Sequence, residues 1–427
     1  MMSFLKRLWN NEFYQGGIYL TVSSFLVNIL NYFFNLVTGR ALGPIGFGEI
    51  TTLLSYTTIF SVPILVVSMI IIEKLGAKGR ERFNFAKDLE KWFLSKIKRW
   101  WFLIFLALLF SPFVPRITNL STFSSYFLIP LIILAFLGAF YGALGQGLRL
   151  FFEFSVVSII AVAVKLAGGI LALLGIGRLN IVVIFILLSS IYGLLEYRRV
   201  IIKRVLRVAN HANRMLDKRI INVVTNPQFV LIFISVLALI VLNNFDVIFV
   251  KKFFSAQDAG IYAAWSLFAK IILYSVGPIF SIAYIFFTSK ENQIFHEKTL
   301  NISLIVLAAI TLISYSFYSY FSAFIINIFF GNKFISVAPY LGRASIFGSL
   351  YAGITFLNNY FLAKKSGFGL ILPVSLPFYI VGLFLIPKKL GVLIELNIIF
   401  AVLALLLYLI AYARIFFYNS ADGKIKR

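Results

Sequence analysis

The chain has 427 residues, of which 61% are hydrophobic and only 13% are charged, and its net charge is +24. This composition leaves too little polar surface to cover a soluble globule, so it predicts an integral membrane protein. The absence of cysteine excludes disulfides, thiolate metal sites and a cysteine nucleophile. The two histidines form no zinc-binding pattern, and no phosphate-binding loop for ATP is present, so neither a metal nor a cofactor is expected.

Twelve apolar runs are each about long enough to cross a bilayer, which takes roughly 20 residues in a helix. Runs of this length without strict alternation predict helices rather than a β-barrel. The third run is short and ends at Pro115. The predicted spans cover residues 17–38, 50–72, 100–114, 126–145, 152–176, 180–196, 229–250, 261–287, 300–325, 338–362, 368–386 and 391–417.

Lysine and arginine gather on one side of the predicted membrane. With the N-terminus in the cytoplasm, 28 of the 39 fall in cytoplasmic connections or, as Arg414 does, at the cytoplasmic end of a span, 8 fall in the opposite connections and 3 lie deeper within spans. Cytoplasmic loops carry an excess of these residues, so both termini are expected in the cytoplasm. The cations lie between apolar runs and form no basic and aromatic face, so nucleic acid is not an expected partner.

The two halves of the chain repeat several residues at an offset of 212. Six spans in each half return the chain to its starting side, so the halves are expected to be parallel repeats related by an axis along the membrane normal. The matched pairs are Asn31 with Asn243, Arg40 with Lys252 and Gly48 with Gly260.

This pattern predicts an all-α integral membrane protein with two six-helix bundles around a central cavity. Residues 1–197 form the N-terminal bundle and residues 229–427 form the C-terminal bundle with a short basic tail. Residues 198–228 form a basic cytoplasmic linker, which we expect to lie against the headgroups of anionic lipids.

Three short motifs occur in a characteristic order along this frame. They are Arg40 followed by Leu42-Gly43-Pro44-x-x-Phe47-Gly48, then Asp258-Ala259-Gly260-Ile261-Tyr262, then Phe330-Gly331-x-Lys333-Phe334. With the polar first helix, the chain resembles the polysaccharide exporters of the multidrug/oligosaccharidyl-lipid/polysaccharide (MOP) exporter superfamily. Within that superfamily it resembles the Wzx-type flippases of O-antigen and exopolysaccharide units.

The resemblance implies a flippase of the bacterial cytoplasmic (inner) membrane. Its substrate would be an undecaprenyl-diphosphate-linked oligosaccharide, the repeat unit of O-antigen, capsule or exopolysaccharide, moved to the periplasmic leaflet by alternating access through a cationic central cavity. A polysaccharide polymerase and a chain-length regulator would be its partners. Twelve spans differ from the fourteen of the lipid II flippase branch, which makes a peptidoglycan precursor the less expected substrate.

A polar stripe runs along one face of the first predicted helix, because its residues recur at steps of three and four. Such a stripe can line a hydrated cavity or form hydrogen bonds with a neighbouring helix, and its length favours the cavity. Its members are Thr21, Ser24, Asn28, Asn31, Asn35 and Thr38.

Three cations, Lys165, Lys270 and Arg343, fall within predicted spans. A charged side chain at the centre of a span costs about 2.5–3.5 kcal/mol, so these residues should face the protein interior. There they could bind the diphosphate of a lipid-linked substrate, since cations compensate for its loss of water. Arg343 lies near a span end and could instead extend to the membrane surface.

Further charged residues lie at or within the first and seventh spans. Arg40, Lys251 and Lys252, at the predicted periplasmic ends, either anchor the topology or form a gate and second cationic station. Asp246 lies inside the seventh span and either pairs with a cavity lysine or binds a coupling proton or sodium ion, with pairing favoured.

Two other functions compete with the flippase. A cation-coupled multidrug exporter of the same superfamily should present buried acids to its cationic drugs, but here the buried cations outnumber them. A membrane-embedded polysaccharide polymerase or glycosyltransferase generally needs a sizeable loop where its chemistry occurs, and the predicted periplasmic connections are short. We therefore expect a transporter and not an enzyme.

Overall fold

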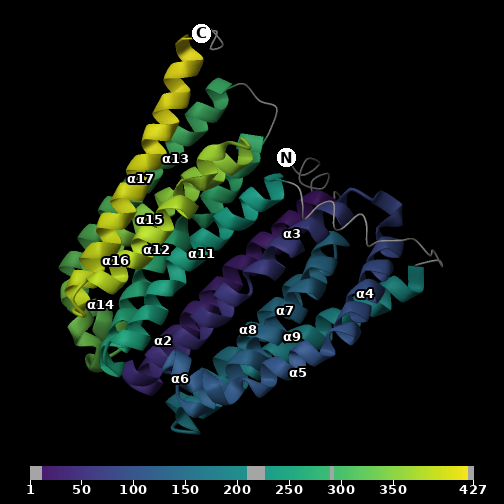
Figure 1. Ribbon diagram of the computed structural model, residues 1–427, viewed down its shortest axis with the longest axis horizontal. Helices are drawn as coiled ribbons and strands as arrows, with labels where there is room; N and C mark the ends of the chain where they lie inside the picture. Colours follow the sequence, from purple (N-terminus) through teal and green to yellow (C-terminus); the bar gives the residue numbers. More distant parts are fainter. Residues whose placement is uncertain (1–11, 209–226, 289–292, 422–427) are drawn as a thin grey trace, which may run out of the picture. The chain divides into compact units, whose positions relative to one another are not determined.

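The computed structural model describes residues 12–208, 227–288 and 293–421 (Figure 1). Every described element is an α-helix or a 3-10 helix. Within this part of the chain, ten helices are long and apolar enough to cross a membrane. The protein is a multi-pass membrane protein, and the predicted all-helical fold class is confirmed.

The described residues fall into two compact units. Unit 1 lies within residues 1–42 and 53–224, and unit 2 lies within residues 43–52 and 225–427. The short segment 43–52 thus belongs to unit 2, although the sequence places it inside the N-terminal bundle.

Unit 1 is built from helices that pack side by side, most closely α8 on α9, α7 on α9 and α3 on α7 (Figure 1). Its helices are α2 (Glu12–Phe60), α3 (Val62–Gly76), α4 (Arg82–Arg99), α5 (Trp101–Leu109), α6 (Val114–Thr118), α7 (Thr122–Gly147), α8 (Phe151–Leu173) and α9 (Arg178–Val208). Since α9 continues to Val208, residues 198–208 of the predicted linker are helical. The rest of that linker, to residue 226, lies outside the described residues.

The connection predicted between the first two spans, residues 39–49, is shortened to a break at Gly43, because α2 consists of two helices that meet at this residue. Gly43 has φ 66° and ψ −174°, which breaks the helix at a conformation that only glycine adopts readily. Pro44 follows as the first residue of the new helical segment, where its missing N–H costs nothing. The second predicted span therefore consists of the end of α2 and of α3.

The third predicted span is short, and the structure explains why. α5 ends at Leu109, a 3-10 turn covers Ser111–Phe113, and α6 completes the crossing. Pro112 and Pro115 each lie at the start of one of these pieces, where proline begins a helical turn but cannot continue an earlier one.

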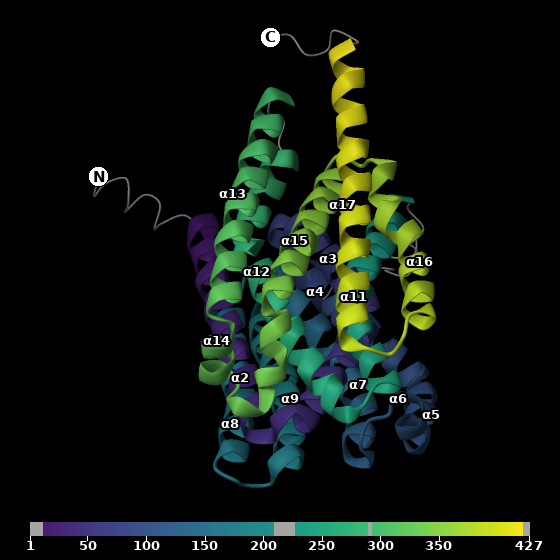
Figure 2. The same cartoon turned by 90° about the vertical axis from the view of Figure 1, so that its left-hand side faces the viewer.

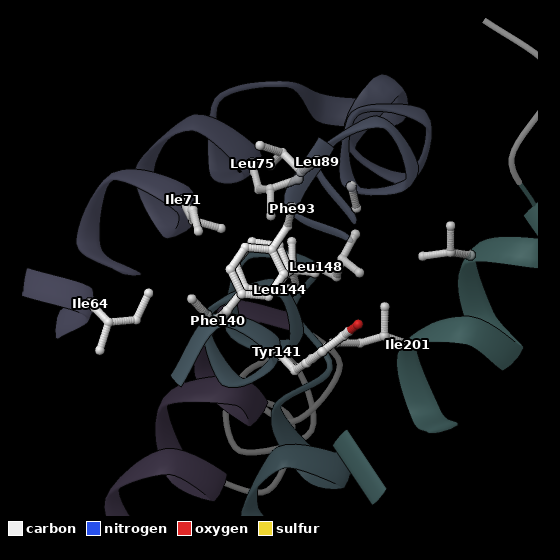
Figure 3. Close-up of a cluster of buried hydrophobic side chains, with 13 residues drawn as sticks. Ile64, Ile71, Leu75, Leu89, Phe93, Phe140, Tyr141, Leu144, Leu148 and Ile201 are labelled. Carbon is white, nitrogen blue, oxygen red and sulfur yellow. The ribbon is translucent and has the colours of Figure 1, made fainter. Parts of the chain in front are cut away.

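A cluster of buried apolar side chains joins α3, α4, α7 and α9 (Figure 3). Phe93 of α4 stacks on Phe140 of α7, with ring centroids 3.7 Å apart and planes 10° apart. Leu75, Leu144 and Ile201 surround these rings and are almost fully buried. α4 is therefore part of the core of unit 1.

Unit 2 has α15 at its centre. This helix packs on α12, α13 and α17, and Figure 2 shows it between them. The helices of unit 2, besides the segment of α2, are α11 (Pro227–Phe253), α12 (Ala256–Thr288), α13 (Gln293–Tyr320), α14 (Ser322–Phe329), α15 (Leu341–Ala363), α16 (Ile371–Leu385) and α17 (Leu390–Ala421).

Candidate functional site

Lys165 lies near the middle of α8 and is held by uncharged groups of α2. Its Nζ donates a hydrogen bond to Oδ1 of Asn31 and lies 4.5 Å from the ring centroid of Phe34. Within the described residues, no carboxylate lies at ion-pair distance from it. The structure therefore brings together Lys165 and Asn31, both predicted as site residues, and leaves the lysine without a compensating negative charge.

The rest of the polar stripe on α2 divides into two groups. Thr21, Ser24 and Asn28 are exposed, while Thr38 is buried. Asn35 is half-buried, and its Nδ2 donates to the carbonyl oxygen of Asn31 at 2.9 Å. It therefore supports the helix backbone near Lys165.

Ser155, which the sequence places on the same face as Lys165, packs between helices instead. Its hydroxyl donates to Ser23 Oγ at 2.9 Å, and both residues are buried. This contact is an interhelical hydrogen bond between α8 and α2 that involves no member of the polar stripe.

Asp246 of α11 is fully buried in unit 2 and interacts electrostatically with Lys270 of α12. Its carboxylate also accepts hydrogen bonds from the hydroxyl of Tyr262 at 2.5 Å and from the backbone N–H of Val247 at 2.8 Å. In the structure Asp246 is held by hydrogen bonds, as buried carboxylates generally are, and no described lysine lies within ion-pair distance of it. Lys270, unlike Lys165, thus has an acid in its surroundings.

The hydrogen bonds of Asp246 continue across two more helices. Tyr262 accepts a hydrogen bond from Nδ2 of Asn397 in α17 at 2.6 Å. Oδ1 of Asn397 in turn accepts one from the hydroxyl of Tyr379 in α16 at 2.8 Å. All four side chains are at most 2% exposed, so the network links α11, α12, α16 and α17 inside unit 2.

Lys251, predicted as part of a gate, forms a buried ion pair. Its Nζ lies 2.7 Å from Oε2 of Glu49, and the two side chains are 6% and 5% exposed. Glu49 belongs to the segment 43–52 of α2. Lys252 is half-buried and Arg40 is exposed.

Two glycines let this segment come very close to α12. A Cβ atom added to Gly260 would lie 1.8 Å from the carbonyl oxygen of Pro44, and one added to Gly48 would lie 2.8 Å from the Gly260 nitrogen. Gly48 and Gly260 are one of the pairs matched by the 212-residue offset. Phe47 fills the space beside them, packed on Phe330 and Phe334.

Arg343 is the third residue of α15 and lies near the helix end, as the sequence indicates. It forms an ion pair with Glu395 at 3.1 Å, and both side chains are about half exposed. Its guanidinium also lies 6.0 Å from the ring centroid of Tyr340. Arg343 is therefore an accessible cation with an acid beside it, in a different setting from that of Lys165.

Sequence reasoning missed the residues that complete these arrangements. Glu49 lies in a predicted connection, because the sequence does not indicate that the helix resumes directly after Gly43. Tyr262, Tyr379 and Asn397 are polar residues within apolar runs, and that position is the one signal that could have singled them out.

The chain matches no protein-family model and no curated protein sequence. Its fold nevertheless matches solved transporters over nearly the whole length. The lipid II flippase MurJ in an inward closed conformation superposes with a TM-score of 0.68 at 16% identity, over 93% of this chain and 87% of that one. The chain has the fold of the MOP-superfamily transporters.

Two further structures support that statement. An inward-facing multidrug resistance MATE transporter of the MOP superfamily gives a TM-score of 0.63 at 15% identity, over 92% of this chain and 96% of that one. The MATE multidrug transporter DinF-BH gives a TM-score of 0.57 at 12% identity, over 93% of this chain and 92% of that one. These MOP-fold neighbours are transporters and not enzymes. Their identities are low, so they establish the fold and leave the substrate open.

Proposed function

We propose that the protein is a flippase that moves an undecaprenyl-diphosphate-linked oligosaccharide from the cytoplasmic to the periplasmic leaflet by alternating access. The MOP transporter fold supports a transporter of some kind. The resemblance to the Wzx-type flippases supports a lipid-linked substrate, destined for O-antigen, capsule or exopolysaccharide. The bacterial inner membrane, with both termini in the cytoplasm, is the corresponding location.

The observation that carries the proposal is the environment of Lys165. A lysine near the middle of a span, surrounded by an amide oxygen and an aromatic ring, has a strong preference for an anionic ligand. A diphosphate must leave water to cross the membrane, and a cation in a medium of low dielectric constant compensates for that loss. Lys165 is thus proposed to bind the diphosphate, with Asn31 orienting its ammonium group.

The other predicted site residues take secondary roles in this proposal. Ser24 and Asn28 contribute polar surface for the sugar, since they are exposed on α2. Lys270 contributes a second cation whose charge Asp246 moderates. Arg343, near the end of α15, is accessible to the substrate at the membrane surface.

A cation-coupled multidrug exporter is the main alternative, because the MATE neighbours share the fold. A site for cationic drugs needs a carboxylate that is available to the drug. Among the described residues, the buried acids are engaged, Asp246 by hydrogen bonds from Tyr262 and Val247, and Glu49 by Lys251. The charge balance therefore favours an anionic substrate.

The experiment compares substitutions of Lys165 in cells whose surface polysaccharide depends on the protein. Lys165→Gln should reduce polysaccharide assembly by roughly 30-fold or more while the protein stays in the membrane, because losing one partner of a desolvated charge pair costs about 2–5 kcal/mol. Lys165→Arg should retain more activity, since it keeps the charge. The control is Lys203→Gln, which removes an exposed lysine of α9.

Two outcomes would contradict the proposal. Unchanged polysaccharide assembly in a Lys165→Gln, Lys270→Gln double variant would exclude the electrostatic mechanism. Export of cationic dyes that depends on Asp246, without any effect on lipid-linked sugars, would instead establish the drug exporter.

A further inference from the structure

α4 carries two different faces along its length. Ala86, Leu89 and Phe93 are buried in the core of unit 1, where Figure 3 shows Leu89 and Phe93 among the side chains of the cluster. Steps of three and four residues place these three on one side of the helix. The helix is therefore fixed on the unit by its apolar side.

The opposite side of α4 is cationic. Lys87, Lys91, Lys98 and Arg99 fall there, roughly half a turn away from the buried residues. Lys91, Lys98 and Arg99 are exposed, and Lys87 is half-buried. In the described part of the chain, no carboxylate lies within ion-pair distance of any of the four.

The neighbouring helix α9 contrasts with this pattern, because three of its arginines have acid partners. Arg204 lies 2.6 Å from Glu153, and Arg199 lies 3.1 Å from Glu196. Arg198 lies 3.9 Å from Glu90 of α4, which also accepts a hydrogen bond from Tyr141. Glu90, on the inner flank of α4, is thus used inside the unit. The other acid of α4, Asp88, falls on the cationic side, but neither it nor any other described carboxylate lies within ion-pair distance of the four cations.

The chain enters the apolar part of the membrane directly after α4. Trp100 and Trp101 are 50% and 62% exposed, and α5 follows without a single buried residue. A helix of phenylalanine and leucine that is exposed throughout has lipid acyl chains as its natural surroundings. Tryptophan is enriched where a chain passes from headgroups to hydrocarbon, so the last turn of α4 lies at the depth of the headgroups.

We propose that the outer face of α4 binds the phosphate headgroups of anionic phospholipids in the leaflet that α5 enters. Several unpaired cations within one 18-residue helix match a layer of anionic headgroups better than a single small anion. An acidic protein is the less suitable partner, because the cations continue without a break into tryptophans and a lipid-exposed helix. The interaction does not depend on the transported substrate.

The test uses the cysteine-free chain with one reporter, Ser95→Cys, labelled with a fluorophore on the exposed side of α4. The full protein is reconstituted in vesicles of 30% phosphatidylglycerol and 70% phosphatidylcholine, and spin-labelled versions of each lipid are used as quenchers. Spin-labelled phosphatidylglycerol should quench more strongly than the zwitterionic lipid at equal content. The ratio of the two measures local enrichment.

Removing the cations should abolish that enrichment. Each Lys or Arg near an anionic surface contributes about 1 kcal/mol, so each loss should lower the preference about fivefold. Lys91→Gln, Lys98→Gln and Arg99→Gln together should equalise the two lipids, whereas Lys91→Arg with Lys98→Arg should keep the difference. The matched control is Arg116→Gln, Lys333→Gln and Lys389→Gln, which removes three cations predicted on the opposite side of the membrane.

Raising the salt concentration to 1 M should reduce the enrichment in the chain that carries only the reporter cysteine, since exposed charges are screened. This measurement does not require the variants to fold. Equal quenching by both lipids at low salt would overturn the proposal. So would an unchanged preference in the α4 triple variant, or an equal loss in the control.

Discussion

Replacing Lys251 by methionine keeps the length of the side chain but removes the cation that faces Glu49. The two charges are 2.7 Å apart and their side chains are only 6% and 5% exposed. Removing one partner of such a buried pair leaves an uncompensated charge and typically costs 3–5 kcal/mol. Lys251→Met should therefore lower the free energy of unfolding by about 3–5 kcal/mol. This corresponds to a change of more than a hundredfold in the equilibrium constant for unfolding.

The second half of the experiment removes both charges. Glu49→Gln alone should also destabilise, because it leaves Lys251 buried without its acid. The double variant Glu49→Gln, Lys251→Met leaves no buried charge, and replacing both partners is often close to neutral. The double variant should therefore lose much less stability than the sum of the two single variants. The coupling free energy between Glu49 and Lys251 should be at least about 3 kcal/mol.

Unfolding of the purified protein in detergent micelles, driven by added denaturant and followed by tryptophan fluorescence, measures these free energies. The control cycle uses Arg199 and Glu196, which form an ion pair at 3.1 Å. Their side chains are 61% and 30% exposed. An exposed helical pair contributes about 0.5 kcal/mol or less. If Lys251→Met were no more costly than Arg199→Met, or if the two buried substitutions were additive, the pair would not hold the segment 43–52 in unit 2.

The close approach at Gly260, the hydrogen bonds of Tyr262 and the distribution of cations can each be tested. Gly260→Ala should destabilise by about 1–3 kcal/mol or more, because the added carbon would lie 1.8 Å from the Pro44 oxygen. The control is Gly145→Ala, because the nearest neighbour of its added carbon would lie 4.0 Å away. Thermal unfolding should show a large loss of stability for Gly260→Ala and little change for Gly145→Ala. Tyr262→Phe should cost at least about 2 kcal/mol, because Asp246 and Asn397 each lose a buried hydrogen bond, whereas Tyr320→Phe, 85% exposed, should have no effect on denaturant unfolding. In intact cells, a membrane-impermeant thiol reagent should label Leu174→Cys but not Lys91→Cys, and labelling of the second position alone would reverse the predicted topology.

Hydropathy predicted the helices well where apolar runs were long and uninterrupted. α8 and α11 begin and end within about three residues of the predicted spans. The first connection was placed correctly but made too long. Polar and small residues between Arg40 and Glu49 lower the hydropathy as a loop would, whereas the structure confines the break to Gly43 and resumes the helix at Pro44.

The candidate site was predictable in residue type but not in pairing. Lysines within spans stood out because hydrocarbon excludes charge, and Asn31 stood out through its place in a polar stripe. Their contact spans 134 positions of sequence, and helix periodicity carries no information on which faces of two distant helices meet. For the same reason Lys251 was identified as a possible gate while its partner Glu49 was not.

The two lysines predicted for the substrate differ in what surrounds them, and this difference bears on how a flippase of this kind could work. Lys270 has Asp246 in its neighbourhood, and the acid is itself held by Tyr262. Lys165 has an amide oxygen and an aromatic ring, which stabilise a cation without cancelling its charge. An arriving diphosphate would thus gain more from Lys165, where it replaces no existing anion, than from Lys270, where it must compete with one. Under the proposed function, unit 1 therefore provides the stronger attraction for the diphosphate. Unit 2 provides a second cation, Lys270, in the neighbourhood of a hydrogen-bonded acid.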